Sequence, residues 1–177
     1  VFIILIFTAF TTGALAQCPK NPAISEELDE AYRSLKFAKF PRDAQVATDV
    51  LWSLWTRAPD NRAQRLLNRG MMNLRLGDLA AAEGFLSVLI KYCPDYAEGY
   101  NQRAFARYLA GNFEGALPDL ARALSIQPRH LGALSGKGLT HLALGQPELA
   151  EIEFRKEMAL NPFTADRDLI PNLGTDL

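Results

Sequence analysis

The sequence has few of the residues that carry catalysis, bind metals or bind nucleic acid. Its 177 residues include only two cysteines and two histidines, and the formal net charge at pH 7 is −1. A nucleic-acid-binding surface normally shows a strong basic excess or a basic stripe, so the balanced charge argues against nucleic acid as a partner. Apolar residues make up 49% of the chain, which suits one domain with an ordinary core.

Catalytic and metal-binding motifs are also lacking. His130 and His141 have no metal-ligand spacing with a cysteine or a carboxylate, and no G-x-S-x-G nucleophile elbow occurs. The stretch from Gly132 to Gly138 resembles a phosphate-binding loop. However, it is one residue short between its glycines and has Gly138 where Ser or Thr should follow Lys137. We therefore assign the stretch to helix packing and expect no enzyme activity, metal, cofactor or small-molecule substrate.

The first sixteen residues, VFIILIFTAFTTGALA, contain no charge and end in the small-x-small pattern of Ala14 to Ala16. This composition is typical of a secretory signal peptide, so we expect cleavage after Ala16 and a periplasmic or secreted protein. The run is short for a spanning helix, and membrane contact is expected only if the segment is retained. A start at Val1 without a basic n-region leaves open whether Val1 is the true start.

Export would place Cys18 and Cys93 in an oxidising compartment, and three states remain open. The residues after the cleavage site, at about 3.3 Å each, are long enough to let the two cysteines pair across one helical hairpin. Alternatively, Cys93 is a small buried residue and Cys18 is free. A third alternative is a lipidated Cys18, although Gln17 is large for the residue that precedes a lipidated cysteine.

One pattern occurs three times between residues 63 and 164. Three glycines stand 34 residues apart: Gly77, Gly111 and Gly145. Three prolines share this spacing: Pro94, Pro128 and Pro162. Small residues repeat in two further registers: Gly70, Ala104 and Gly138, and then Ala82, Ala116 and Ala150. A fixed period of this length indicates a solenoid of stacked units, here 63–96, 97–130 and 131–164.

Each unit reads as two helices. In the first, apolar residues at helical spacing run from Ala63 to Leu76. Gly77 ends that helix, because glycine readily adopts the left-handed conformation found there. Asp78 is a suitable N-cap for the next helix, which should stop before Pro94.

The segments outside the repeats are predicted to cap the array. Residues 17–24 read as a flexible tail, and residues 25–59 as a helical hairpin that lacks the glycine between its helices. We interpret this hairpin as a degenerate terminal repeat. Trp52 and Trp55 are expected to cover the N-terminal end of the stack, the alternative being a partner-facing aromatic pair. Residues 165–177 predict a C-terminal capping tail that offers Leu169, Ile170 and Leu173.

The second unit carries the positions of a known repeat, from Tyr100 and Ala104 through Gly111 and Ala116 to Pro128. It resembles a tetratricopeptide repeat, with Leu120 and Ala123 also in register, and the flanking units match it. The resemblance implies an all-α, right-handed superhelical solenoid of antiparallel helix hairpins. Together with the predicted signal peptide, this leads us to expect a tetratricopeptide-repeat protein of an exported bacterial type. Three regular repeats would follow the degenerate N-terminal hairpin. Glu157 departs from the pattern, because a small apolar residue is expected there.

A cation precedes the small residue of each first helix: Arg69, Arg103 and Lys137. An anion-binding ladder is one interpretation. In the family that these units resemble, however, acids sixteen residues later, here Asp119 and Glu153, form structural ion pairs within the hairpin. Phe85 occupies the matching slot for Arg69, so Arg69 is the best candidate for a partner-binding cation, although Glu83 is within reach.

The resemblance also implies a concave groove, lined by the first helices, that binds a peptide or a protein segment. The candidate groove residues are Leu67, Arg69, Met71, Leu74, Arg75, Glu98, Asn101, Phe105, Tyr108, Ser135, Leu139 and Leu142. For Phe105 and Leu139, packing between repeats is the alternative. The Lys and Asn cluster by which related domains grip chaperone carboxylates is missing. Its slots hold Leu67, Met71, Gln102, Gly132 and Gly136.

The expected function is that of a non-enzymatic periplasmic adaptor or assembly scaffold whose partner is a protein or peptide. The alternative is a structural subunit that docks permanently in a larger cell-envelope complex. It would dock through its convex face or through the Trp52–Trp55 pair.

Overall fold

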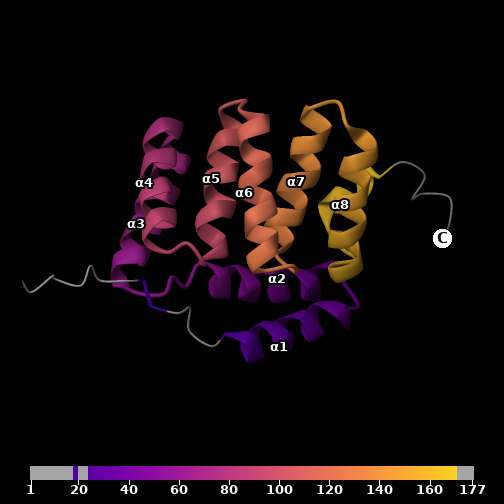
Figure 1. Ribbon diagram of the computed structural model, residues 1–177. Helices are drawn as coiled ribbons and strands as arrows, with labels where there is room; N and C mark the ends of the chain where they lie inside the picture. Colours follow the sequence, from indigo (N-terminus) through magenta and orange to yellow (C-terminus); the bar gives the residue numbers. More distant parts are fainter. Residues whose placement is uncertain (1–17, 20–23, 171–177) are drawn as a thin grey trace, which may run out of the picture.

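The computed structural model describes residues 18–19 and 24–170 (Figure 1). The predicted signal peptide, its cleavage site and Leu173 lie outside these residues. Within them the chain is all-helical, with eight α-helices, one 3-10 helix and no strand. None of the helices in this part of the chain is long and apolar enough to span a bilayer.

The helices follow one another in hairpins. The bounds are α1 Ser25–Lys36, α2 Pro41–Trp55, α3 Asn61–Leu76, α4 Leu79–Tyr92, α5 Ala97–Leu109, α6 Phe113–Ile126, α7 Leu131–Ala143 and α8 Pro147–Leu160, with the 3-10 helix η1 at Ala165–Leu169. The side chains of Asp60, Asp78 and Asn112 cap α3, α4 and α6 by accepting backbone N–H groups in the first turn. The three repeat glycines have φ values of 77°, 76° and 70°, which explains why each repeat has glycine between its helices.

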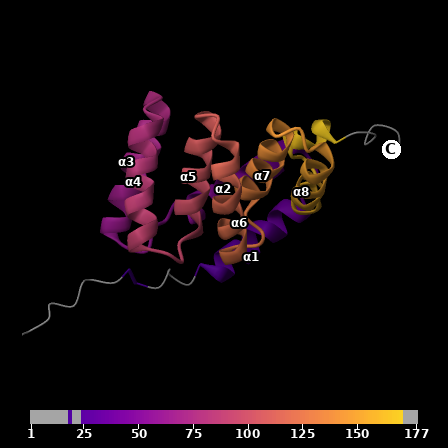
Figure 2. The ribbon, with the colours of Figure 1, turned by 45° about the horizontal axis from the view of Figure 1, so that its top comes forward.

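The three regular hairpins, α3–α4, α5–α6 and α7–α8, stand side by side in one row (Figures 1 and 2). Small residues allow the two helices of a hairpin to approach closely. A Cβ added at Gly70 would lie 2.6 Å from Cγ of Leu86, and one at Gly138 would collide with the ring of Phe154. The predicted all-α solenoid of helix hairpins is therefore confirmed.

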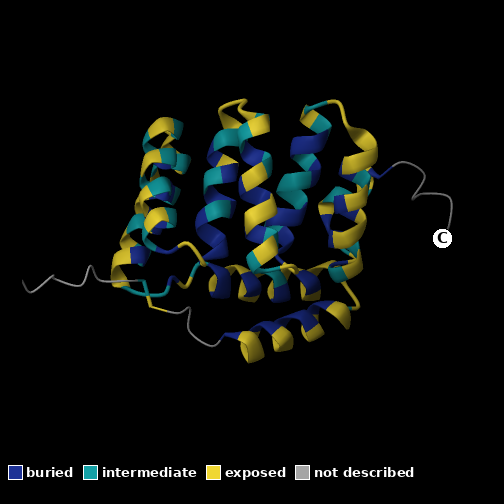
Figure 3. Ribbon diagram, viewed as in Figure 1, coloured by how far each residue is buried: buried dark blue, intermediate teal, exposed yellow. Residues whose placement is uncertain are grey.

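The N-terminal hairpin does not continue this row. Helices α1 and α2 cross beneath the lower ends of the other helices (Figure 1), and α2 does not pack along α3 as α4 packs along α5. Its core of Leu35, Leu51, Leu54 and Trp55 includes Leu131 from the start of α7. The burial of α1 supports this placement of the hairpin, because one face of α1 is buried and its outer face is exposed (Figure 3).

Hydrogen bonds fasten the hairpin to the turns between the units. Tyr32 donates to the carbonyl of Arg129, and Tyr96 donates to the carbonyl of Trp55 at 2.7 Å. The predicted capping of the first end of the stack is therefore wrong. The spacing shared with the repeats indicates a helix pair, but the apolar face of that pair is buried by the loop ends of the second and third units.

The C-terminal segment covers the last hairpin with one side chain. Ile170 is buried against Ala150 and Phe154, whereas Leu169 is largely exposed. Of the expected covering residues, Ile170 packs as predicted and Leu169 does not, because the short helix η1 turns it outward to solvent.

Cys18 and Cys93 form a disulfide with a Cα–Cα distance of 5.1 Å. Cys93 is the C-cap residue of α4, so the bond ties the segment before α1 to the first regular unit. Both cysteines of the chain are engaged, which leaves neither a free thiol nor a thiol for lipidation in this structure.

Candidate functional site

The inner side of the stack holds a cavity of about 420 Å³. Its lining comes from α3, α5 and α7, with single residues from α2 and α6: Trp52, Met71, Leu74, Arg75, Asn101, Gln102, Ala104, Phe105, Tyr108, Leu120, Gly132, Ser135, Gly136, Leu139 and Thr140. We call this cavity the groove. Eight of the twelve predicted groove residues line it.

Helical spacing places these side chains on one face. Asn101, Phe105 and Tyr108 lie four and three residues apart on α5, and therefore project toward the same side. The glycine-rich stretch that resembles a phosphate-binding loop lies entirely within α7, in agreement with its assignment to helix packing. A Cβ at Gly132 would touch the ring of Trp52 at 3.4 Å, so the glycine lets the indole approach the wall of the groove.

Aromatic side chains give the groove an apolar surface that reaches solvent. Phe105 remains 49% exposed, and Tyr108 packs against Phe113 with ring centroids 5.4 Å apart. The interpretation of Phe105 as a residue packed between repeats does not fit this exposure. An apolar ring held at the mouth of a cavity is a surface that a partner side chain can cover.

The two tryptophans have different environments. Trp55 is only 2% exposed and stacks on His130, with ring centroids 4.1 Å apart. Trp52 is 36% exposed and lines the groove. The expectation that both cover the end of the stack is therefore wrong, and the partner-facing alternative applies to Trp52 alone. Their three-residue spacing is compatible with this split, but it does not indicate which ring faces the groove.

A buried polar network supports the groove floor. The carboxylate of Glu98 accepts hydrogen bonds from Gln102 Nε2 at 2.6 Å and from Asn101 Nδ2 at 3.1 Å, and it contacts His130 Nε2 at 2.9 Å. His130 Nδ1 accepts the backbone N–H of Ala133, which assigns the ring proton to Nε2 and makes it a donor to Glu98. The network holds the two amides in place beneath the apolar lining.

Four predicted groove residues lie elsewhere. Glu98 is buried in the network just described, and Leu67 is fully buried in the core of the first unit. Leu142 packs in the cluster around Phe154, and Arg69 is not part of the lining. For these four positions the groove prediction is wrong, because helical spacing gives the face of a helix but not how deeply each residue on it is buried.

The side chain of Arg69 does not lie where the repeat spacing predicted. Its guanidinium lies over the ring of Phe85, 5.5 Å from the centroid. Glu83 pairs with Arg107 at 2.7 Å instead, and no ion pair of Arg69 occurs among the described residues. Arg69 is exposed, but it does not face the groove as a partner-binding cation.

The other two cations of the pattern are held by acids. Arg103 meets Asp119 through two hydrogen bonds, of 2.7 and 2.8 Å, and the side-chain hydrogen bond to Asp119 raises the pKa of Arg103. Lys137 donates to Glu153 at 3.0 Å. Burial raises the pKa of Glu153, but hydrogen bonds from Lys137 and Lys156 outweigh it and hold that pKa below its usual range. These cations specify packing and do not form an anion-binding ladder.

A second cavity, of about 300 Å³, adjoins the groove between α2 and the end of α8. Trp52, Gly132 and Ser135 line both cavities. The hydroxyl of Ser135 donates to Asp166, so this predicted groove residue also anchors the C-terminal segment. Gln102 and Thr140 line the groove although they are not among the predicted groove residues, and Trp52 lines it in agreement with the partner-facing alternative.

Glu157 lies in the second cavity, at the position where the repeat favours a small apolar residue. Its side chain is 95% buried and accepts a hydrogen bond of 2.7 Å from the Thr164 hydroxyl. Burial raises the pKa of Glu157 to about 8, the hydrogen bond from Thr164 opposes this, and the neighbouring Asp166 raises it further. Among the residues that the structure describes, no three metal-ligating side chains cluster.

No family model matches the chain. A TPR repeat-containing protein of Rhizobium etli is 28% identical over 142 residues, which are 80% of this chain and 69% of that protein. Tetratricopeptide repeat protein 36 of Bos taurus is 31% identical over 121 residues, or 66% of this chain and 64% of that protein. The chain thus spans about two thirds of the length of these relatives.

Two solved structures show the same fold. The first TPR of Spaghetti (RPAP3), bound to an HSP90 peptide, superposes with a TM-score of 0.59 at 20% identity, covering 61% of this chain and 90% of that one. MamA superposes with a TM-score of 0.53 at 20% identity, covering 77% of this chain and 76% of that one. The chain repeats its 34-residue pattern three times and is similar in sequence to these relatives. It is therefore a tetratricopeptide-repeat protein.

Proposed function

We propose that this chain is a non-enzymatic protein-interaction module that binds an extended or helical segment of a partner in the groove. The observation that carries this proposal is the cavity of about 420 Å³ with a half-exposed Phe105 at its mouth. An apolar aromatic surface in a concave site is typical of peptide-binding grooves. The RPAP3 domain, solved with an HSP90 peptide, adds a case in which a protein of this fold binds a peptide.

The lining defines the chemistry of the partner. Met71, Leu74, Tyr108 and Leu139 surround the space beside Phe105 with apolar surface. Glu98 engages one amide donor each of Asn101 and Gln102, so the apolar side chains supply most of the surface for direct recognition. A partner segment should therefore insert apolar anchors.

The rim of the groove adds one charge. Arg75 is the only charged residue of the lining and is exposed. An acidic residue of the partner would find its complement there. The missing Lys and Asn cluster suggests a partner other than a chaperone carboxylate.

The module is proposed to act in an oxidising compartment, as a periplasmic or secreted adaptor or assembly scaffold. The Cys18–Cys93 disulfide supports this, because such bonds persist mainly outside the reducing cytosol. Docking of a permanent subunit through the tryptophan pair has no support, since Trp55 is buried beneath the stack. Docking through the convex face stays a prediction that no observation favours.

The test compares one protein with two groove substitutions and one protein with a matched surface substitution. Phe105→Ala together with Tyr108→Ala should abolish co-purification of the crosslinked partner, while Val88→Ala, at an equally exposed position (49%) on α4, should leave it intact. Pull-down from crosslinked cells, quantified by mass spectrometry, gives the readout. Unchanged capture by the double variant would contradict groove binding.

A further inference from the structure

The turn between α1 and α2 exposes two phenylalanines. Phe37 is 74% exposed and Phe40 is 66% exposed, whereas Phe154 in the repeat core is fully buried. The two rings stand three residues apart at the outer end of the hairpin. Isolated exposed apolar side chains are common, but two aromatic rings at a projecting turn form an apolar patch, and such patches are typical of interaction sites.

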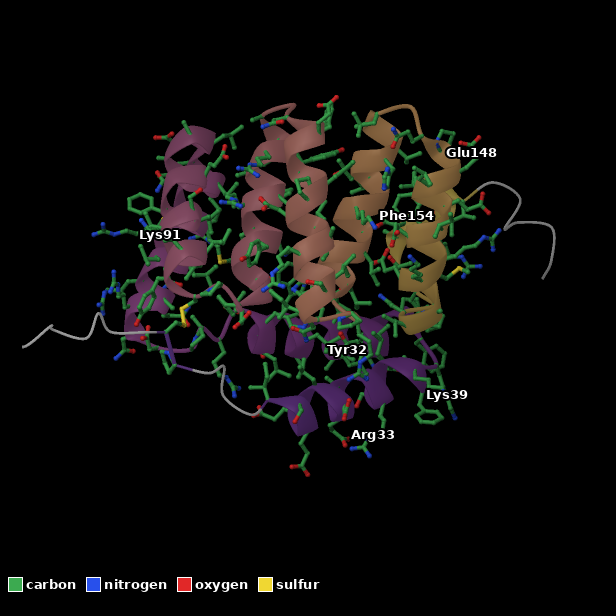
Figure 4. The ribbon with its side chains drawn as sticks, viewed as in Figure 1. Tyr32, Arg33, Lys39, Lys91, Glu148 and Phe154 are labelled. Atoms are coloured by element: carbon green, nitrogen blue, oxygen red, sulfur yellow. A yellow bond between two sulfur atoms is a disulfide. The ribbon has the colours of Figure 1, made fainter. Side chains whose placement is uncertain are left out.

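Cations alternate with these rings. The segment from Lys36 to Arg42 reads KFAKFPR and contains three cations and no acid. Lys36, Lys39 and Arg42 are exposed, and none forms an ion pair with a described residue. Figure 4 shows Lys39 at the outer end of the hairpin and Arg33 further along α1. We call residues 36–42 the basic turn.

A cavity of about 400 Å³ adjoins the basic turn. Its lining includes three cations, Arg33, Lys36 and Arg129, and one acid, Asp29. Arg129 pairs with Asp29 and Arg33 with a neighbouring glutamate, so Lys36 is the lining cation that forms no ion pair with a described residue. Arg129 packs its guanidinium over the ring of Tyr32, 4.2 Å from the centroid, which fixes it at the wall of the cavity. Each paired guanidinium keeps N–H donors that its carboxylate does not occupy, and together with the unpaired Lys36 these donors suit a phosphate group.

We propose that the basic turn docks this protein on the surface of a bilayer that contains anionic phospholipids. The rings of Phe37 and Phe40 enter the interface between headgroups and acyl chains, where aromatic side chains are stable. Lys39 and Arg42 lie among the headgroups, and the adjoining cavity holds one lipid phosphate. Charge complementarity favours an anionic bilayer, because each lysine or arginine near such a surface adds attraction.

This mode of docking is peripheral and separate from the groove. The basic turn belongs to the N-terminal hairpin, whereas the groove is lined mainly by α3, α5 and α7. The proposal therefore does not depend on whether the groove binds a peptide, and its failure would leave the proposed function untouched.

The experiment places a fluorescent reporter in the basic turn itself. Phe40→Trp is made in the chain from Val1 to Leu177, and the fluorescence of the unsubstituted chain, from Trp52 and Trp55, is subtracted. The probes are vesicles of equal parts phosphatidylcholine and phosphatidylglycerol with brominated acyl chains, and vesicles of phosphatidylcholine alone. Because the readout is quenching at position 40, binding through the apolar residues 1–16 does not imitate it.

We expect strong quenching on the anionic vesicles and weak quenching on the neutral ones. In the Phe40→Trp background, Phe37→Ser should weaken vesicle partitioning roughly tenfold, because one buried ring is lost. Lys36→Gln and Lys39→Gln should each weaken it roughly fivefold and reduce its dependence on salt. The matched controls are Leu76→Ser, at a position with 73% exposure on α3, and Lys91→Gln, on the exposed surface of α4 (Figure 4).

Four results would overturn the proposal. The first is no quenching at position 40 on anionic vesicles, and the second is equal loss of partitioning in the control variants. The third is saturation of the cavity by inorganic phosphate with no response to vesicles, which would make it a phosphate site. Self-association through the basic turn, seen as a larger sedimentation coefficient that Phe37→Ser reverses without any vesicle binding, would replace the bilayer with a second copy.

Discussion

The regular repeats and the N-terminal hairpin are both pairs of antiparallel helices, yet different contacts hold them. In the repeats, small residues such as Gly70 and Gly138 set a short distance between helices, and a left-handed glycine closes each pair. The hairpin lacks that glycine and is fastened by large aromatic residues, Trp55 on His130 and Tyr32 on the Arg129 carbonyl. Small residues allow the same close helix–helix packing in every repeat. The large aromatic residues of the N-terminal hairpin instead form specific contacts that occur only once in the structure.

The largest expected effect comes from removing the aromatic contact of the hairpin. Trp55→Ala should lower the free energy of unfolding by about 3–5 kcal/mol, because it deletes a fully buried ring between α2 and His130. Chemical denaturation measures it. Trp52→Ala, which removes the more exposed neighbouring ring, should cost much less stability but weaken partner binding. Equal destabilisation by the two variants would contradict the different roles of the two rings.

A smaller effect depends on pH and arises where the hairpin meets α8. The pKa of Glu157 is about 8 in the folded chain, against an ordinary glutamate pKa of 4.5, so the folded state holds the proton more tightly. The resulting stabilisation is full below pH 4.5 and is lost as the pH rises toward 8. We expect a loss of roughly 2–4 kcal/mol across this window for the unsubstituted chain.

Glu157→Gln should remove this pH dependence and be the more stable protein at pH 8, as followed by denaturation at several pH values. The control is Glu148→Gln, at an exposed position on the same helix (Figure 4), which should leave the pH dependence in place. A Glu157→Gln protein with the original pH profile would assign the dependence to other groups.

The smallest expected effect tests the small residues of the repeats. A Cβ at Gly70 would lie 2.6 Å from Cγ of Leu86, so Gly70→Ala should destabilise the chain by about 1–3 kcal/mol through overpacking. Gly84 has open space around it on α4, and Gly84→Ala should instead stabilise the chain by about 0.5–1 kcal/mol, because alanine favours the helix. Thermal unfolding of both variants measures these effects. A shift of the melting temperature in the same direction in both variants would contradict the packing role of Gly70.

The sequence alone determined the elements and the contacts within each repeat. The 34-residue period located the hairpins, and the capping residues and glycines marked where helices begin and end. The sixteen-residue spacing from Arg103 to Asp119 and from Lys137 to Glu153 corresponds to the ion pairs in the structure. These features are predictable because they depend on local backbone conformation or on neighbours at a fixed, repeated spacing.

The tertiary structure alone decided where the N-terminal hairpin lies and which side chains the groove exposes. Its contacts join residues far apart in sequence, such as Tyr32 with Arg129 and Trp55 with His130, and each occurs once. Helical spacing placed Glu98 on the groove face, but its carboxylate contacts His130, in the turn that ends the same unit, and is buried there. A contact that occurs only once leaves no repeated pattern in the sequence. It forms only after the repeats have stacked and the ends of their helices make a surface on which the hairpin can pack.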